Sequence, residues 1–374
     1  MAGVESEAGR PGGAEIPPGL AARLAQLFPG ARVARWRSLA VDEHAEGESG
    51  KAAGYGEPLR IELALPDGST REVVFHTAGA NDFGHDRRSD RAQQMLLAWD
   101  TFRLVPRHVA ALDVGAIAED GALIPLDRAG ELYLVTSWAP GTLYADDLRR
   151  VGDTGVATPL DLDRAAALAP SLADLHRAPG SHPGAYVRAI RDLVGHGEGI
   201  AGLCDAYGDD VPAAPRQRIE ALERACLEWR FRLRRRTDRL RRTHGDFHPF
   251  NVVFQDGVDF VVLDASRGCE GDPADDVACL ALNYLFFAVG HPGARGEGPH
   301  ALWTRFWDVY LAAAGHDAVL DAVAPFLAWR SLVVASPVWY PHVGRDERDR
   351  VLRLAERALA APRFDPAWGL EVLR

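Results

Sequence analysis

Three side chains that carry oxygen ligands, at a characteristic spacing, are the most informative feature of this sequence. Asp246 lies within the segment 244–248, which reads HGDFH; Asn251 follows it by five positions, and Asp264 follows Asn251 by thirteen. A positioned carboxylate can orient a hydroxyl and take its proton. Amide and carboxylate oxygens suit magnesium, which also uses substrate phosphates as ligands. The pattern therefore predicts a phosphoryl-transfer site, with Asp246 as its catalytic residue and with Asn251 and Asp264 as metal ligands.

The residues between Asn251 and Asp264 predict the element that brings the three side chains together. Residues 251–254 and 259–263 are apolar and β-prone, and Gln255-Asp256-Gly257 between them is typical of a turn. The resulting hairpin would gather the three side chains at one end. The alternative is an ordinary turn at residues 244–246 and an Asp that merely ends a strand. Coincidence explains the pattern less well, because a further acidic segment, GDPADDVA, follows at residues 271–278.

These segments match the pattern HGDxHxxN, then an Asp, then GDPxxDLA, with DVA at residues 276–278 in place of the last three letters. In this the sequence resembles the aminoglycoside phosphotransferase and choline kinase-like family. Residues 172–176 (LADLH) and 132–141 (LYLVTSWAPG) are similar to the family's helix before the catalytic loop and to its hinge. The resemblance covers roughly residues 130–280.

The resemblance implies an α+β chain with a two-lobed, protein-kinase-like fold, in which the N-lobe is a small antiparallel sheet and the C-lobe is mainly helical. It implies Mg²⁺ as cofactor and ATP or GTP as co-substrate. Asp246 would be the catalytic base or hydroxyl-positioning residue, and Asn251 and Asp264 would bind magnesium. Ser137 and Ala139, in the hinge segment, would contact the nucleotide. His244, Asp272 and Asp276 would hold the loops in place.

The order of predicted elements suits such a fold. Residues 1–15 resemble a flexible tail, residues 16–137 a nucleotide-binding N-lobe, and residues 138–374 a helical C-lobe with the catalytic loop and acceptor site. The N-lobe is expected to contain helices and strands at these positions: helices 20–27 and 89–99, and strands 32–39, 59–65, 71–77, 122–125 and 131–136.

The N-lobe departs from the kinase pattern at its phosphate-binding lysine. The third strand places His76 where that lysine is expected. His76 could donate to a phosphate, or it could have no phosphate role. The chain has 42 basic residues but a single lysine, Lys51, which lies in a Gly-rich segment between the first two strands. Lys51 could supply the missing contact from that loop, or it could be an exposed loop residue.

Bulk composition excludes several classes of protein. The net charge of −11 and pI near 5.6 argue against a nucleic-acid partner. The sequence shows neither a signal peptide nor a segment that would span a membrane, which predicts a cytoplasmic protein. The four cysteines form no CxxC pair and are expected to be reduced thiols.

The expected partners are a nucleotide and a small-molecule acceptor that is amine-bearing or sugar-like. Residues 194–199, Asp205, Asp209, Asp210 and Glu270 are candidates for acceptor binding, and five aromatic side chains could pack on the acceptor: Tyr284, Trp303, Trp307, Trp329 and Trp339. Three other functions stay open. They are a choline-type or sugar kinase, a pseudokinase-like nucleotide-binding module, and transfer of a nucleotidyl group to a protein.

Overall fold

The computed structural model describes residues 16–38, 58–80, 85–104, 109–127, 129, 136–265 and 267–373. The chain divides into two compact units, Met1–Thr136 and Ser137–Arg374, and each has its own core. No helix within the described ranges is long and apolar enough to cross a lipid bilayer. All four cysteines are free.

The first unit is built on a three-stranded antiparallel sheet in the order β1-β2-β3. The turn between β2 and β3 forms because Gly68 adopts φ +85° and Asp67 accepts a hydrogen bond from the Ser69 amide at 2.9 Å. Leu20 and Leu24 pack against one face of the sheet. The described elements of this unit are α1 (Pro18–Leu27), β1 (Arg32–Ser38), β2 (Leu59–Ala64), β3 (Thr70–Phe75), α2 (Arg88–Thr101), η3 (Phe102–Leu104), β4 (Gly115–Ile117) and β5 (Leu123–Pro125).

The predicted helices and the strands near residues 32, 59, 71 and 122 of this unit are confirmed, each within a few residues of its expected ends. The sequence did not predict β4, which pairs with β5 in a short hairpin. The strand predicted at residues 131–136 lies almost wholly outside the described residues.

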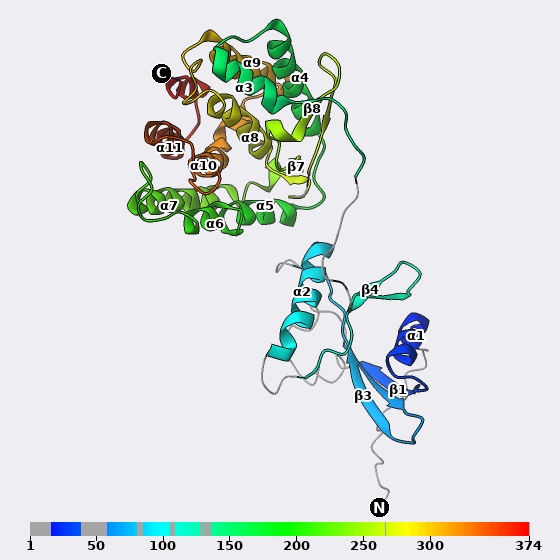
Figure 1. The fold of residues 1–374 in the computed structure, drawn as a ribbon. Helices are drawn as coiled ribbons and strands as arrows, with labels where there is room; N and C mark the ends of the chain where they lie inside the picture. Colours follow the sequence, from blue (N-terminus) through cyan, green and yellow to red (C-terminus); the bar gives the residue numbers. More distant parts are fainter. Residues whose placement is uncertain are drawn as a thin grey trace, which may run out of the picture. The chain divides into compact units, whose positions relative to one another are not determined.

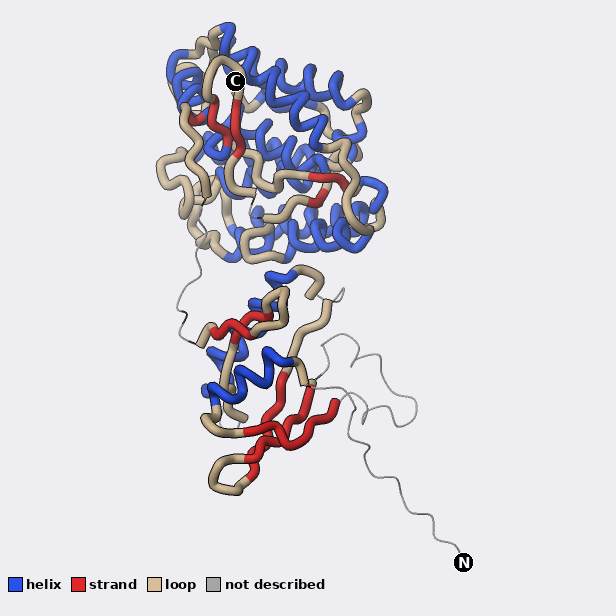
Figure 2. Tube along the Cα trace, turned by 90° about the vertical axis from the view of Figure 1, so that its right-hand side faces the viewer, coloured by secondary structure: helices blue, strands red, loops and turns tan. Residues whose placement is uncertain are grey.

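The second unit is mainly helical, and the short strands are confined to a few places (Figures 1 and 2). Helix α8 carries apolar residues around most of its circumference and is therefore almost entirely buried. Helices α10 and α9 pack against it. The elements are β6 (Thr142–Leu143), α3 (Tyr144–Thr154), α4 (Pro159–Leu175), α5 (Pro183–Gly195), α6 (Ile200–Asp205), α7 (Arg216–Leu233), η4 (Thr237–Arg239), β7 (Arg241–Arg242), η5 (Pro249–Asn251), β8 (Val252–Phe254), β9 (Phe260–Val262), β10 (Glu270–Gly271), α8 (Pro273–Phe286), α9 (Glu297–Ala314), η6 (Ala318–Asp321), α10 (Val323–Val334), α11 (Arg345–Ala360) and η7 (Pro366–Glu371).

The hairpin that the sequence predicts after Asn251 is present. Strands β8 and β9 pair antiparallel, with Val252 opposite Val262 and Phe254 opposite Phe260, and β6 adds to the other edge of β8. The expected fold class is confirmed as α+β, with a small antiparallel sheet in the N-terminal unit and a helical C-terminal unit.

Candidate active site

The loop that carries Asp246 is anchored through its backbone amides, which donate to a buried carboxylate. The carboxylate of Asp276, which is completely buried, accepts hydrogen bonds from the amides of His244 and Gly245, both at 2.8 Å. Gly245 has φ +83°, and a Cβ at this position would lie 2.9 Å from the carbonyl oxygen of Gly268. The loop therefore requires both an acid at position 276 and a glycine at position 245.

Asp272 supports the same region from the start of α8. Its carboxylate accepts a hydrogen bond from the Ala274 amide at 3.0 Å, which caps the helix. It also accepts hydrogen bonds from Nε and Nη2 of Arg239, at 2.6 and 2.8 Å. The hydroxyl of Tyr186 also donates to it, at 2.9 Å. The predicted loop-holding roles of Asp272 and Asp276 agree with these contacts.

Asp246 is buried, and two arginines approach its carboxylate. Nη1 of Arg330 donates to Oδ1 of Asp246 at 2.7 Å, and Nε of Arg267 lies 3.4 Å from Oδ2. The Cys279 thiol lies 3.8 Å from Oδ1, and Nε2 of His248 lies 3.7 Å from Oδ2. The carboxylate is thus fixed in orientation, and its charge is compensated where little water reaches it.

These contacts decide the protonation state of Asp246. Burial alone would raise the pKa of Asp246, but the positive charges of Arg330 and Arg267 outweigh that effect and lower the pKa below its ordinary value. Burial raises the pKa of the neighbouring Asp275 to about 6, although Arg330 acts in the opposite direction. Asp246 is therefore an ionised, weakly basic carboxylate at neutral pH.

Arg330 joins these two acids. Its Nη2 donates to Oδ1 of Asp275 at 3.0 Å and to the carbonyl oxygen of Gly245 at 3.2 Å, and its guanidinium lies 3.8 Å from the ring centroid of Trp329. Arg330 is not among the site residues that the sequence patterns predict. A signal was available, because Arg330 is the one charged residue in α10, whose sequence is otherwise apolar or small.

Asn251 and Asp264 lie at one end of the hairpin. The amide nitrogen of Leu263 donates to the carbonyl oxygen of Asn251 at 2.8 Å, so Asp264 follows directly after the residue paired with Asn251. Nδ2 of Asn251 donates to the carbonyl oxygen of Asp246 at 3.1 Å. That contact uses the nitrogen of the amide, so its oxygen is the atom suited to a cation. Asp264 is exposed and has φ +55°, a conformation rare outside glycine.

This donor set fits magnesium bound together with phosphates. One amide oxygen and one carboxylate give a hard cation part of its shell, and phosphate oxygens and water would complete it. Within the described ranges, no group of three or more His, Cys, Asp or Glu side chains could hold a metal ion by itself. A metal ion bound at Asn251 and Asp264 would therefore need further ligands from outside this group.

Arg267 connects Asp246 to the segment between α5 and α6. Nη2 of Arg267 lies 3.4 Å from Oε2 of Glu198, and its guanidinium lies 5.1 Å from the ring centroid of Trp329. The indole nitrogen of Trp329 donates to the carbonyl oxygen of Glu198 at 2.9 Å. Of the predicted acceptor residues, Glu198 and Trp329 are the two that these contacts link to the catalytic loop.

The other acceptor candidates are placed differently. The carboxylate of Glu270 accepts from the amide and hydroxyl of Ser181. Asp205 and Asp209 line a separate acidic cavity of about 350 Å³ beside α6 and α7. Among the aromatic candidates, Tyr284, Trp303, Trp307 and Trp329 are buried in the hydrophobic core, whereas Trp339 is exposed. The core positions reflect helix packing, because aromatic residues at helical spacing commonly face the interior.

The expected nucleotide-binding residues are spread over both units. His76 follows β3 and is exposed. Ser137 and Ala139 stand at the start of the second unit, before β6, where Ser137 is exposed and Ala139 is partly buried. Lys51 lies outside the described residues.

Comparisons with solved structures return several kinases with low sequence identity. A glucosamine kinase is 17% identical, with a TM-score of 0.41, over 93% of this chain and 98% of that one; a second crystal form of it aligns over 59% and 56%, with a TM-score of 0.36. An ethanolamine kinase of Plasmodium vivax is 12% identical over 82% and 80%, with a TM-score of 0.34. A choline kinase of Streptococcus pneumoniae is 13% identical over 91% and 97%, with a TM-score of 0.31.

The sequence comparisons give a clearer result. None of the curated proteins compared with this sequence matches it significantly. The model of the phosphotransferase enzyme family matches residues 88–326, which is more than half of the chain and includes the loop of Asp246, the hairpin and all of α8. The chain therefore belongs to the phosphotransferase enzyme family, whose members have the protein-kinase-like fold, and it is a phosphotransferase.

Proposed function

We propose that this protein is a small-molecule kinase that transfers the γ-phosphate of ATP or GTP to a hydroxyl group of an amine-bearing or sugar-like acceptor. The observation that carries the proposal is the environment of Asp246. Its ionised carboxylate is held by Arg330 and Arg267, and its loop is joined by a hydrogen bond to the metal-ligand candidate Asn251.

Asp246 would act mainly by orientation. Phosphoryl transfer passes through a loose transition state, in which the attacking hydroxyl keeps its proton until late. A carboxylate with a lowered pKa is a weak base, but it accepts a hydrogen bond from the hydroxyl and receives the proton once the oxygen–phosphorus bond has formed. Rigid positioning by two arginines suits that role, because it places the acceptor oxygen for in-line attack.

Asn251 and Asp264 would hold Mg²⁺ together with the nucleotide. When bound, the metal supplies charge neutralisation for the transferred phosphoryl group. Ser137 and Ala139 are proposed to contact the nucleotide from the hinge segment. His76 and Lys51 are the two proposed sources of the phosphate contact for which kinases use a lysine of the third strand.

Glu198 supports an acceptor that carries an amine. Its side chain is 68% exposed, and its carboxylate is linked to Asp246 through Arg267. An ammonium group that approaches Asp246 would therefore find the carboxylate of Glu198 within reach. Arg267 already occupies part of this space, so the acceptor would compete with it for Glu198.

A pseudokinase-like nucleotide-binding module is the second candidate, and His76 is the observation that favours it, because a lysine normally occupies this position. Retention of Asp246, Asn251 and Asp264 together favours catalysis instead. A choline-type or sugar kinase is the main alternative within the preferred class.

One experiment separates these functions. The protein is incubated with Mg·ATP or Mg·GTP and with pooled aminoglycosides, aminoalcohols and sugars, and products are identified by mass spectrometry. Asp246→Asn tests the catalytic role, and Asp146→Asn, at an exposed position on α3, is the matched control. A phosphorylated small molecule from wild type and control, but not from Asp246→Asn, supports the proposal. Nucleotide binding without any product would replace it with the binding-module function, and transfer of AMP to a protein would identify a nucleotidyltransferase.

A further inference from the structure

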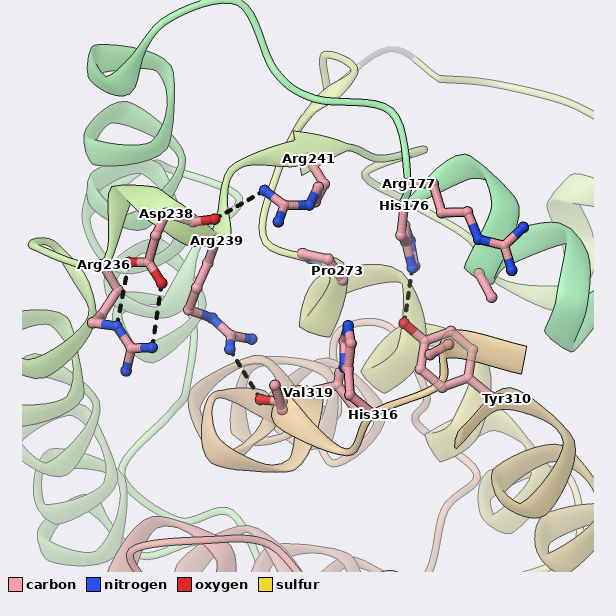
Figure 3. A pocket seen from close by; sticks show the side chains of 13 residues that line it. His176, Arg177, Arg236, Asp238, Arg239, Arg241, Pro273, Tyr310, His316 and Val319 are labelled. Atoms are coloured by element: carbon pink, nitrogen blue, oxygen red, sulfur yellow. Dashed lines mark hydrogen bonds and ion pairs between the residues drawn. The ribbon is translucent and has the colours of Figure 1, made fainter. Parts of the chain in front are cut away.

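The second unit contains a basic cavity that none of the proposed active-site residues lines. It has a volume of about 180 Å³ and lies among the end of α4, the segment 236–241, the start of α8 and the region between α9 and η6. Four arginines and two histidines line it, against a single carboxylate, that of Asp238. Figure 3 shows Arg239, Arg241 and His316 around the same space. In a chain of net charge −11, a cavity lined by this many basic side chains favours an anionic ligand.

Most of these arginines already have carboxylate partners. Nε and Nη2 of Arg239 donate to the carboxylate oxygens of Asp272 at 2.6 and 2.8 Å. Nε of Arg236 lies 3.3 Å from Oδ1 of Asp238. Arg177 forms an ion pair with Asp174. These pairs compensate much of the charge, so the ligand-binding capacity depends on the remaining basic groups.

Arg241 is different. Within the described part of the chain, its guanidinium donates through Nη1 to two main-chain carbonyl oxygens, those of Asp238 at 2.9 Å and Leu240 at 2.7 Å. These contacts orient the group but leave its positive charge without a carboxylate, and they leave Nε and Nη2 as donors. The exposed His316 lines the same cavity from the turn after α9. A guanidinium with free donors and a nearby imidazole suits a phosphate oxyanion.

The size of the cavity limits the ligand. A volume of about 180 Å³ is below the roughly 300–1,000 Å³ that encloses a drug-sized ligand, so a nucleotide would not be enclosed. We propose that this cavity is a binding site for a small phosphate anion, either inorganic phosphate or the phosphoryl group of a small phosphomonoester, with Arg241 and His316 as its main ligands. This site is separate from the proposed active site and does not depend on the proposed function.

The site has a physical connection to the catalytic loop. His176 lines the cavity, its Nδ1 lies 2.9 Å from the hydroxyl of Tyr310, and its Nε2 lies 3.1 Å from Oδ2 of Asp276. Oδ2 of Asp276 also accepts from the His244 amide. A ligand in the cavity would therefore lie beside His176, which contacts Asp276, and Asp276 in turn anchors the loop of Asp246.

Calorimetric titration with sodium phosphate at constant ionic strength tests the proposal, with glycerol 3-phosphate titrated in parallel to distinguish the free ion from a phosphomonoester. Arg241→Gln is compared with Arg224→Gln, which removes the same charge from an exposed position on α7 outside the cavity. We expect saturable binding whose Kd rises about tenfold or more in Arg241→Gln, because a charge-assisted contact is lost, and is unchanged in Arg224→Gln.

A second variant keeps the test decisive. His316→Gln changes an exposed side chain and is expected to raise the Kd without affecting folding. If circular dichroism shows that Arg241→Gln is unfolded, this variant decides the outcome. Absence of saturable binding to wild type, or an unchanged Kd in the folded cavity variants, would overturn the proposal. Tighter binding of either titrant identifies the source of the phosphate group.

Discussion

Nη1 of Arg330 lies 2.7 Å from Oδ1 of Asp246, although the two residues are 84 positions apart in the sequence. Nη2 of the same guanidinium reaches Asp275 at 3.0 Å. A buried arginine thus compensates the charges of the buried Asp246 and of the partly buried Asp275.

Replacement of Arg330 is expected to impair both catalysis and stability. Arg330→Gln leaves Asp246 and Asp275 without their shared cation, which should lower the free energy of unfolding by about 3–5 kcal/mol. Loss of the orienting contact should lower kcat by about 10- to 100-fold. Arg330→Lys should lie in between, because lysine keeps the charge but loses the two-pronged geometry. Urea unfolding and initial rates measure the two effects.

If Arg330 positions Asp246, its replacement should also shift the pH profile of activity. Because Arg330 lowers the pKa of Asp246, the acid limb of kcat/KM should move to higher pH in Arg330→Gln. Arg357→Gln, at an exposed ion pair with Glu371, is the control and should leave the profile unchanged. An unmoved acid limb in a folded Arg330→Gln variant would reduce Arg330 to a purely structural residue.

Asp275 should give the folded protein a measurable pH dependence. Burial raises its pKa to about 6, above the value of an unfolded chain, so the folded state binds this proton more tightly. The stability that this proton contributes is present below about pH 4 and is lost as pH rises through about 6, by at most ~3 kcal/mol. Asp275→Asn should lack this slope between pH 4 and 6 in urea unfolding, whereas Asp321→Asn, at an exposed ion pair, should retain it.

Gly245→Ala should disrupt the catalytic loop. The substitution combines a positive φ with a Cβ that would lie 2.9 Å from the Gly268 carbonyl oxygen. Gly257→Ala is the matched control, because Gly257 also has a positive φ, +54°, but has nothing within 4 Å of an added Cβ. Both variants should lose about 1 kcal/mol or more to backbone strain. Only Gly245→Ala should also lose most of its turnover, and equal turnover in the two variants would contradict the proposed dependence of the site on loop geometry.

The hairpin offers a test of metal binding. Asp264→Ala should weaken Mg²⁺-dependent nucleotide binding about tenfold or more, because a charged ligand is removed. Asp246→Asn should leave that binding largely intact while abolishing transfer. Asp259→Ala changes an exposed carboxylate on the same hairpin and should affect neither property. Titration of a fluorescent nucleotide at several Mg²⁺ concentrations gives the three results, and normal metal-dependent binding by Asp264→Ala would remove it from the ligand set.

Glu198 should set the preference for charged acceptors. Glu198→Gln is expected to raise KM about tenfold for an amine-bearing acceptor, because a carboxylate contact to an ammonium becomes a neutral one. KM for a neutral sugar should not change. Glu228→Gln on α7, away from the catalytic loop, is the control. Equal effects of Glu198→Gln on both acceptor classes would argue against a direct role in amine recognition.

The loop of Asp246, the hairpin and the supports at Asp272 and Asp276 could be predicted because their spacing is local in the sequence. Arg330 could not be placed beside Asp246, because only the packing of α10 against α8 brings them together. The same limit applies to Tyr284 and Trp303, which were candidates for acceptor binding and are buried in the core. Side-chain type does not show which face of a helix is turned inward when apolar residues surround it.

The position of Arg330 just beyond the family match has a practical consequence for protein engineering. The family match ends at residue 326, four residues before Arg330 and three before Trp329. A fragment trimmed to the family boundaries would keep Asp246, Asn251 and Asp264 and would still be recognised as a family member. It would nevertheless lack the guanidinium of Arg330, which contacts both Asp246 and Asp275. We therefore expect a fragment that ends at residue 326 to fold poorly and to lose activity, whereas a fragment that retains α10 should keep both properties.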